Sequence, residues 1–213
     1  MYTDEAGEAG VRAAFAEVRA EPVESGWEDR WKTFHRPVRA GGLWIGPPWL
    51  AAPGDVEAVV VDPGLAFGTG AHATTRACIE LLAGLERGSL LDAGCGSGVV
   101  AVAAVQLGFT PVHAVDVDPV AVAVAGETAR RNAAPVDVRH LDVLRDALPE
   151  ADVVVANIEL AVIEQLLGRA TPRVAVTSGY LASERPRAPG WIGVDRLELD
   201  GWAADVLANT ALS

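Results

Sequence analysis

The clearest chemical signal in the sequence is a glycine-rich turn with an acid at its head. The segment DAGCGSG follows an apolar run and precedes a second apolar run that begins at Val99. Its acid is Asp92 and its glycines are Gly94, Gly96 and Gly98. Glycines allow a tight backbone turn and let a ligand approach without a Cβ in the way. The pattern predicts a strand, a ligand-binding turn and the start of a helix.

A second acid, Asp116, ends the next predicted strand. A carboxylate there can accept both hydroxyls of a ribose, so a cofactor that contains a nucleoside fits. A dinucleotide site needs a glycine where Val99 stands, and Asp92 at the mouth of the turn would repel a pyrophosphate. The same carboxylate attracts the cationic amino-acid end of S-adenosylmethionine. Charge therefore favours this methyl donor over NAD.

Two further segments carry polar side chains near the same edge of the predicted sheet. Asn157 ends another strand and can accept a hydrogen bond from an amine, although it could equally cap the following helix. The glycine-rich segment 62–75 has no lysine after its last glycine, so it is not a nucleotide P-loop. Its length suits a lid over a ligand. The alternative is an ordinary loop with Thr74 or Thr75 near a helix start.

Other candidates have an ordinary structural interpretation beside a functional one. His72 is the candidate base near the lid, but methyl transfer does not demand a base, which favours a packing or cofactor-edge role. Glu159 could attract a cationic substrate or serve as a helix-dipole partner. Asp142 could meet an adenine amino group or be a solvated turn residue. Cys95 is interpreted as a small filler, and the four scattered histidines predict no metal site.

Short apolar runs alternate with helical segments from residue 57 onward. Strands are predicted at 58–61, 89–92, 112–116, 136–140, 152–156 and 173–177, and helices at 71–85, 97–107, 119–132 and 159–169. Runs such as Val153-Val154-Val155 are apolar at every position, which indicates a parallel sheet covered on both faces. Right-handed crossovers then give a doubly wound, Rossmann-like α/β sheet. Residues 191–199 and 202–207 predict a C-terminal antiparallel hairpin that turns at Asp200-Gly201.

The chain divides near residue 55. Residues 1–54 are irregular and proline-rich, with one possible short helix over 10–20, and are interpreted as an N-terminal extension and linker. Residues 55–213 are interpreted as the catalytic domain. No internal repeat is present.

Composition limits the partners and the compartment. The 17 basic and 29 acidic residues give a net charge of −12, so no direct nucleic-acid or anionic-membrane binding is expected, and a cationic partner is favoured. Two cysteines and no secretory signal make a reducing cytoplasm the default location. The longest apolar run, 99–105, is far short of the ~20 residues of a membrane span. Nothing in the sequence indicates an oligomeric state.

With these residues in view, the sequence resembles the PrmA family, the bacterial methyltransferases of large-subunit ribosomal protein eleven. The segment DPGLAFGTGAHATT (62–75) is similar to the lid loop of that family almost position for position. The segments DAGCGSG, VDVDP and VVVANI follow in the order and spacing of the family. WEDRW and LWIGPPW resemble the segment that joins its two domains. The glycine turn is common to many methyltransferases, whereas the lid loop is specific.

The resemblance implies transfer of methyl groups from S-adenosylmethionine to lysine side chains and the N-terminal amine of the ribosomal protein. It also implies which residues contact the cofactor: Thr75, Gly94, Asp116 and Asn157, with Gly96 and Phe67 as further candidates. Asn157 is the catalytic candidate, because it would also orient the target amine.

Two departures from the family concern the substrate rather than the methyl-donor site. The family begins with a separate ferredoxin-like recognition domain, of which residues 10–24 would be a remnant. The helix expected after the fifth strand is replaced by SERPRAPG (183–190), whose two prolines prevent a regular helix. The target is therefore the same ribosomal protein, another amine-bearing protein or a small molecule. An NAD-linked oxidoreductase and a non-catalytic binding module are the competing interpretations.

Overall fold

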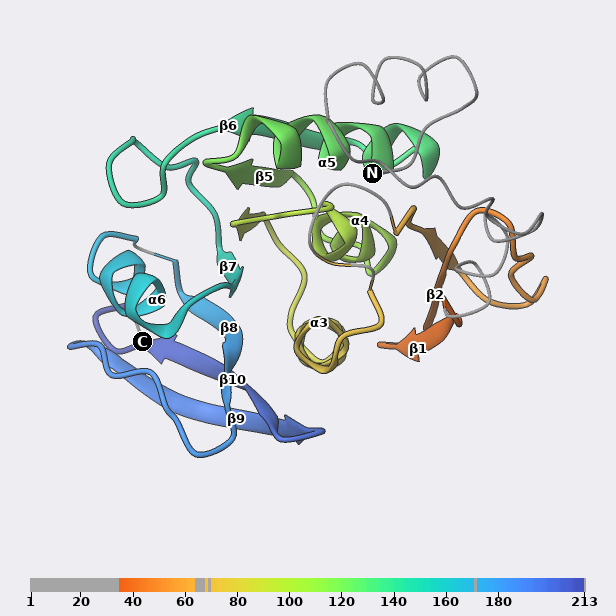
Figure 1. Cartoon of the computed structure of the whole chain (residues 1–213). Coiled ribbons are helices and arrows are strands. Elements are labelled where there is room, and N and C mark those ends of the chain that lie inside the picture. Colours follow the sequence, from red (N-terminus) through yellow and green to blue (C-terminus); the bar gives the residue numbers. More distant parts are fainter. Residues whose placement is uncertain (1–34, 64–67, 69, 171, 213) are drawn as a thin grey trace, which may run out of the picture. The chain divides into compact units, whose positions relative to one another are not determined.

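A computed structural model describes residues 35–63, 68, 70–170 and 172–212 (Figure 1). These residues belong to one compact unit that begins at His35. The helix predicted over 10–20, the remnant predicted over 10–24 and Phe67 lie outside the described residues. The interpretation of residues 1–54 as a recognition-domain remnant therefore stays a prediction.

A seven-stranded sheet forms the centre of the described unit (Figure 1). In spatial order its strands are β6 (Val136–His140), β5 (Val112–Asp116), β4 (Leu90–Ala93), β7 (Val153–Asn157), β8 (Val174–Leu181), β10 (Trp202–Asn209) and β9 (Trp191–Leu199). The strands from β6 to β8 are parallel, and β10 pairs antiparallel with both β8 and β9. The predicted doubly wound sheet with a C-terminal antiparallel hairpin is confirmed.

Among the described residues, four helices cover the two faces of this sheet. They are α3 (Ala73–Ala83), α4 (Val99–Gln106), α5 (Pro119–Arg131) and α6 (Leu160–Leu167). The first three lie on one face and α6 lies on the other (Figure 1). Successive strand residues enter opposite cores: Val153 and Val155 pack with α3 and α4, whereas Val154 packs with α6. This explains why the strands are apolar at every position. No described helix is long and apolar enough to cross a membrane.

The C-terminal strands follow the predicted turn chemistry. Asp200 and Gly201 have φ values of 51° and 82°, as a two-residue hairpin turn with both central residues in the left-handed region requires. No helix forms in residues 182–190, where Pro186 and Pro189 stand. The chain instead runs from β8 to β9 through residues 182–190 without a helix.

A second, three-stranded sheet corrects two expectations. It comprises β1 (Val38–Ala40), β2 (Leu43–Gly46) and β3 (Ala58–Val60). Residues 38–46 were expected to be irregular, but the Gly41-Gly42 pair between them turns a hairpin, a signal that the sequence did contain. The strand predicted at 58–61 was expected in the main sheet but pairs with β2. The Asn132 side chain accepts from the Val60 N–H and donates to the Val60 carbonyl, both at 2.7 Å. The residue that ends α5 therefore satisfies the backbone groups of Val60 in β3.

Candidate ligand-binding site

A cavity of about 780 Å³ opens at the carboxyl ends of β4, β5 and β7. The chain order reverses between β4 and β7, which is the place where open parallel sheets bind ligands. Residues that line it from these strands and the turns after them are Gly94, Gly96, Asp116, Val117, Asn157, Ile158 and Glu159. Its other described walls come from His72, Thr74, Leu141, Asp142, Val143, Leu144, Val162, Gly179 and Trp202.

A second cavity of about 790 Å³ lies at the opposite, amino end of β4 and β7. Ser89, Asp152 and Arg169 are among its lining residues. It contains none of the predicted site residues that the structure describes. The cavity at the carboxyl ends of the strands is therefore the candidate functional site.

The turn after β4 brings backbone into this cavity where a side chain would not fit. Gly94 has a φ of 77°, and a Cβ on it would lie 2.4 Å from Cγ2 of Ile158. Only glycine combines this left-handed conformation with this close approach. Gly94 and Gly96 both line the cavity, as the sequence predicts.

Asp116 lies beside this turn, at the end of β5. Its carboxylate accepts hydrogen bonds from the backbone N–H of Gly96 and of Asp118, both at 2.9 Å. These bonds tie the glycine turn to β5. A carboxylate has about four acceptor positions, so Asp116 can accept further donors from the cavity that it lines. Its place fits the predicted ribose acceptor.

The prediction that Asp92 faces a ligand at the mouth of the glycine turn is wrong. Its side chain is buried, does not line the cavity and accepts a hydrogen bond from the N–H of Ala101 at 3.0 Å. Burial raises the pKa of Asp92 to about 7; the bond from Ala101 opposes this shift and the charge of Asp116 adds to it. Gly98, the N-cap residue of α4, has no side chain, so Asp92 binds a first-turn N–H in its place. Asp92 therefore holds α4 against β4 and does not face a ligand.

Other acids supply negative charge to the cavity. Asp116, Asp142 and Glu159 line it, and no lysine or arginine does so among the residues described. Asp142 pairs with Arg145 at 3.4 Å and accepts from the N–H of Leu144 at 2.9 Å. Glu159 is exposed at the N-cap of α6 and makes no side-chain capping bond. A cationic ligand is therefore still favoured, by Asp116, Asp142 and Glu159 rather than by Asp92.

Asn157 and Thr75 come together, but only Asn157 lines the cavity. The Asn157 amide nitrogen donates to the Thr75 hydroxyl at 3.4 Å. Thr75 itself is buried, 1% exposed, in the first turns of α3. The N-cap residue of α6 is Glu159, so Asn157 does not hold that position. Contact of Thr75 and Asn157 with a cofactor stays a prediction.

His72 and Trp202 form the wall next to α3. Nδ1 of His72 lies 2.8 Å from the Thr74 hydroxyl and accepts from the Thr74 N–H at 3.4 Å, so His72 caps α3. Its ring meets Trp202 edge-on, with centroids 5.0 Å apart. Trp202 and Gly179 also line the cavity, although no motif in the sequence predicts them there. The only signal for them was the C-terminal hairpin, whose pairing with β8 brings Trp202 to this edge.

The remaining candidates do not add chemistry to this cavity. Burial and the charges of Asp92 and Asp116 raise the pKa of the Cys95 thiol, which agrees with an unreactive packing role. Among the described residues, no group of three or more potential metal-binding side chains is present.

The sheet order and the glycine turn at its switch point define a Rossmann-like methyltransferase fold. An rRNA methyltransferase from Streptomyces viridochromogenes shares this fold over 64% of this chain and 84% of its own, with a TM-score of 0.50 and 20% identity. The crystal structure of ribosomal protein L11 methylase from Lactobacillus delbrueckii subsp. bulgaricus is more similar. It covers 81% of this chain and 98% of its own, with a TM-score of 0.73 and 25% identity.

The profile of the family described as ribosomal protein L11 methyltransferase (PrmA) matches residues 6–184. The chain belongs to this family, which confirms the resemblance that its motifs carry. The ribosomal protein L11 methyltransferase of Symbiobacterium thermophilum is 41% identical over 197 residues, or 85% of this chain. The match spans 65% of that relative, so the chain covers less than two thirds of its length.

Proposed function

We propose that this chain is an S-adenosylmethionine-dependent protein N-methyltransferase that acts on lysine or N-terminal amines of a large-subunit ribosomal protein. The observation that carries the proposal is the cavity between β4 and β7, which is lined by acidic side chains and by the backbone of Gly94 and Gly96. Asp116, Asp142 and Glu159 favour a cationic ligand there and disfavour a diphosphate. Family membership supplies the reaction class.

The residues present fit such a cofactor. Gly94 and Gly96 line the cavity and carry no side chain, so a ligand can lie against the backbone there. Asp116, Val117 and Leu141 line the cavity, which supports a role for Asp116 as acceptor of the ribose hydroxyls and for Val117 and Leu141 as apolar surface for the base. When bound, S-adenosylmethionine supplies a methyl group activated by its sulfonium. We assign cofactor contacts to Gly94, Gly96, Asp116 and Asn157, with Thr75 acting through Asn157, and retain Phe67 as a candidate.

The acceptor amine must be neutral to attack. A lysine of pKa ~10.4 is only ~0.1% neutral near pH ~7.4, so the site must lower that value by desolvation and by nearby positive charge. Asn157 donates to Thr75 through its nitrogen, which leaves its oxygen to accept from the amine and orient the lone pair. The role of the chain is then alignment and exclusion of water. A protein base is not required.

The substrate follows from charge and from the relatives. A net charge of −12 suits a basic partner such as a ribosomal protein. The relatives are named as methyltransferases of ribosomal protein L11, which we propose as the first substrate to test. A cytoplasmic location belongs to the same proposal, and the free cysteines Cys78 and Cys95 suit a reducing compartment.

Two measurements test this function. Calorimetric titration should show binding of S-adenosylmethionine and none of NAD; tight NAD binding alone would overturn the proposal in favour of an oxidoreductase. Radiolabelled methyl transfer to purified large-subunit ribosomal proteins should then label one basic protein, and mass spectrometry should place the label on an amine. Cofactor binding without any labelled product would indicate a non-catalytic binding module instead.

A further inference from the structure

A β-bulge in β8 lies directly against the turn that carries Asn157. Tyr180 pairs with Ala203 and Ser178 with Ala204, so Gly179 between them has no partner on β10. Gly179 has a φ of 106°, and a Cβ on it would lie 2.2 Å from the carbonyl oxygen of Ile158. Bulges of this kind bend a strand and change the direction of its neighbours.

The contact between the bulge and the turn is also hydrogen-bonded. The N–H of Ile158 donates to the carbonyl of Ser178 at 3.1 Å. Ile158 and Gly179 both line the cavity, next to Asn157. A shift of the bulge would therefore move the side of the cavity to which Asn157 belongs.

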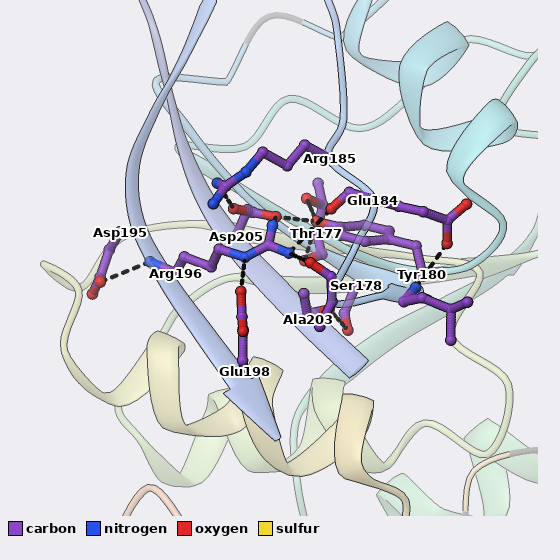
Figure 2. Close-up of polar contacts among 12 residues, drawn as sticks. Thr177, Ser178, Tyr180, Glu184, Arg185, Asp195, Arg196, Glu198, Ala203 and Asp205 are labelled. Carbon is purple, nitrogen blue, oxygen red and sulfur yellow. Dashed lines mark hydrogen bonds and ion pairs between the residues drawn. The ribbon is translucent and has the colours of Figure 1, made fainter. Parts of the chain in front are cut away.

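Buried side chains join the two ends of this bulge (Figure 2). The Tyr180 hydroxyl lies 2.8 Å from the Thr177 hydroxyl and donates to the Asp205 carboxylate at 2.8 Å. Thr177 precedes the bulge, Tyr180 follows it, and Asp205 stands opposite on β10. The Ser178 hydroxyl adds a bond of 2.6 Å to the carbonyl of Ala203. These bonds select one register for residues 177–180.

Arg196 extends the network to β9 and to the segment after β8. Its guanidinium donates to Asp205 at 2.8 Å (Figure 2). It also donates to the carbonyls of Ala182 and Glu184 at 2.6 and 3.1 Å. The Asp205 and Arg196 side chains are 4% and 11% exposed. Replacing a buried ion pair by apolar residues is often neutral or stabilising, so this pair is by itself weak evidence for a contribution to stability. Burial, together with Asp205, raises the pKa of Tyr180, so its hydroxyl remains a donor.

We propose that Thr177, Tyr180 and Asp205, with Arg196, are positioning residues that hold the Gly179 bulge against Ile158 and so set the acceptor side of the cavity. This inference rests on the proposed methyl transfer and adds to it a group of residues outside the cavity. It predicts that loosening the network slows transfer to the amine more than it weakens cofactor binding, because Gly94, Gly96 and Asp116 lie away from the bulge and only Asn157 belongs to both sides.

The variant Tyr180→Phe tests this with little disturbance, because Asp205 keeps its pair with Arg196. We expect the kcat for methylation of the ribosomal protein to fall about 10-fold, and the Kd for S-adenosylmethionine to change less than about twofold. Thr177→Val should act in the same direction, whereas Thr177→Ser, which keeps the hydroxyl, should restore near wild-type kcat.

A matched control comes from a bridge far from the cavity. Asn132 joins β3 to α5 through bonds of 2.7 Å to Val60 and does not line the cavity. Asn132→Ala should lower the melting temperature and leave kcat unchanged when assayed well below it. A wild-type kcat in Tyr180→Phe, or a loss of cofactor affinity parallel to the loss of kcat, would overturn the proposal.

Amide hydrogen exchange provides a readout that does not depend on activity. Exchange of the Ile158 amide, which is bonded to Ser178, should become about 10-fold faster in Tyr180→Phe and in Thr177→Val than in the wild type. Unchanged exchange in both variants overturns the positioning role even if methyl transfer is demonstrated. If the wild type transfers no methyl group, the proposed function fails, while faster exchange at Ile158 still supports control of the turn by the network.

Discussion

The main sheet contributes to the cavity from two sides, the β4–β5 half and the β8–β10 half, and the two halves are built in different ways. Ile158, which follows β7, lies between them. From β4, the turn at Gly94 approaches the Ile158 side chain; from β8, the bulge at Gly179 approaches the Ile158 backbone. The first half gets its shape from a short stretch of backbone and one carboxylate, Asp116. The second half gets its shape from side-chain bonds between three strands, such as the one from Tyr180 to Asp205, 25 residues away.

This difference assigns cofactor binding mainly to one half and alignment of the acceptor amine mainly to the other. In the β4–β5 half, most of the shape comes from the glycine backbone, and Asp116 is the side chain that both ties the turn to β5 and faces the cavity, so substituting Asp116 should alter affinity more than stability. In the β8–β10 half, the backbone geometry depends on the side chains, so substitutions there should alter the shape of the site or the stability of the chain.

The largest effect is expected for Gly179→Ala. The new Cβ would lie 2.2 Å from the oxygen, 2.9 Å from the carbon and 3.0 Å from the nitrogen of Ile158, all backbone atoms that cannot move alone. At Gly94 the one close atom is a side-chain carbon at 2.4 Å, and the next lies at 3.8 Å. We expect Gly179→Ala to destabilise by about 3–4 kcal/mol and Gly94→Ala by about half of that, measured by urea denaturation.

Gly193 provides the control, because nothing lies within 4 Å of a Cβ built there and its φ is not positive. Gly193→Ala in β9 should change the free energy of unfolding by less than about 0.5 kcal/mol. If Gly179→Ala destabilises the protein no more than this control does, the close approach of Gly179 to the Ile158 backbone is not required for the fold. The proposed difference between the two halves would then be wrong.

The second prediction concerns the pH dependence that Asp92 gives to the β4 half. Its ordinary pKa of 3.8 applies to the unfolded chain and a value of about 7 to the folded one. Between these values the folded state binds more protons, so the contribution of Asp92 to stability falls as the pH rises from about 4 to 7. The slope in this window is on the order of 1 kcal/mol per pH unit.

Asp92→Asn removes this titration while its amide oxygen can still accept from the N–H of Ala101. The stability of this variant should vary less than that of the wild type between pH 4 and 7 and exceed it above pH 7. Denaturation curves collected across this range provide the measurement. Parallel curves for the two proteins would show that Asp92 is already ionised in the folded state.

The third prediction tests binding in the same half. Asp116→Ala should weaken the affinity for S-adenosylmethionine by about 10- to 100-fold through loss of a charged, two-oxygen acceptor. Asp152→Ala is the matched control, because Asp152 also accepts from a backbone N–H, that of Ser89 at 2.9 Å, but lines the cavity at the opposite end of the sheet. Calorimetry should show a changed Kd for the first variant and an unchanged Kd for the second. An unchanged Kd for both would refute the placement of Asp116.

Local patterns predicted the parts of the fold that are local in the chain. The all-apolar run at Val153–Val155 indicated a strand buried on both faces, and Asp200-Gly201 indicated the hairpin turn; both are confirmed. Pro186 and Pro189 likewise predicted that no helix follows β8. In these cases the backbone preference of one or two residues decides the structure.

The sequence predictions are wrong or incomplete where contacts with distant segments determine the structure. Asp92 belongs to a motif that reads the same whether its carboxylate faces a ligand or the first turn of α4, and only the packing of that helix shows the latter. The strand at Ala58–Val60 pairs with β2 and is bonded at Val60 by Asn132, and neither partner can be identified from the strand's own residues. Gly179 and Trp202 reach the cavity through the pairing of β8 with β10, which no short motif encodes.

The smallest effect is expected at the exposed end of the second half. Asp200 pairs with Arg76 at 2.6 Å, with side chains 68% and 26% exposed. Exposed ion pairs contribute ~0–1 kcal/mol and are screened by salt. Asparagine tolerates the φ of 51° at this position, so Asp200→Asn should keep the turn and change the free energy of unfolding by less than about 0.5 kcal/mol.

Denaturation at low and high salt checks this, because any small difference should shrink as salt is added. Methyl transfer should be unchanged, since Asp200 does not line the cavity. A loss of several kcal/mol or of kcat would mean that the hairpin register depends on its surface pair rather than on the buried bonds among Tyr180, Asp205 and Arg196. The shape of the acceptor side would then be set at the protein surface, where charge and salt could alter it.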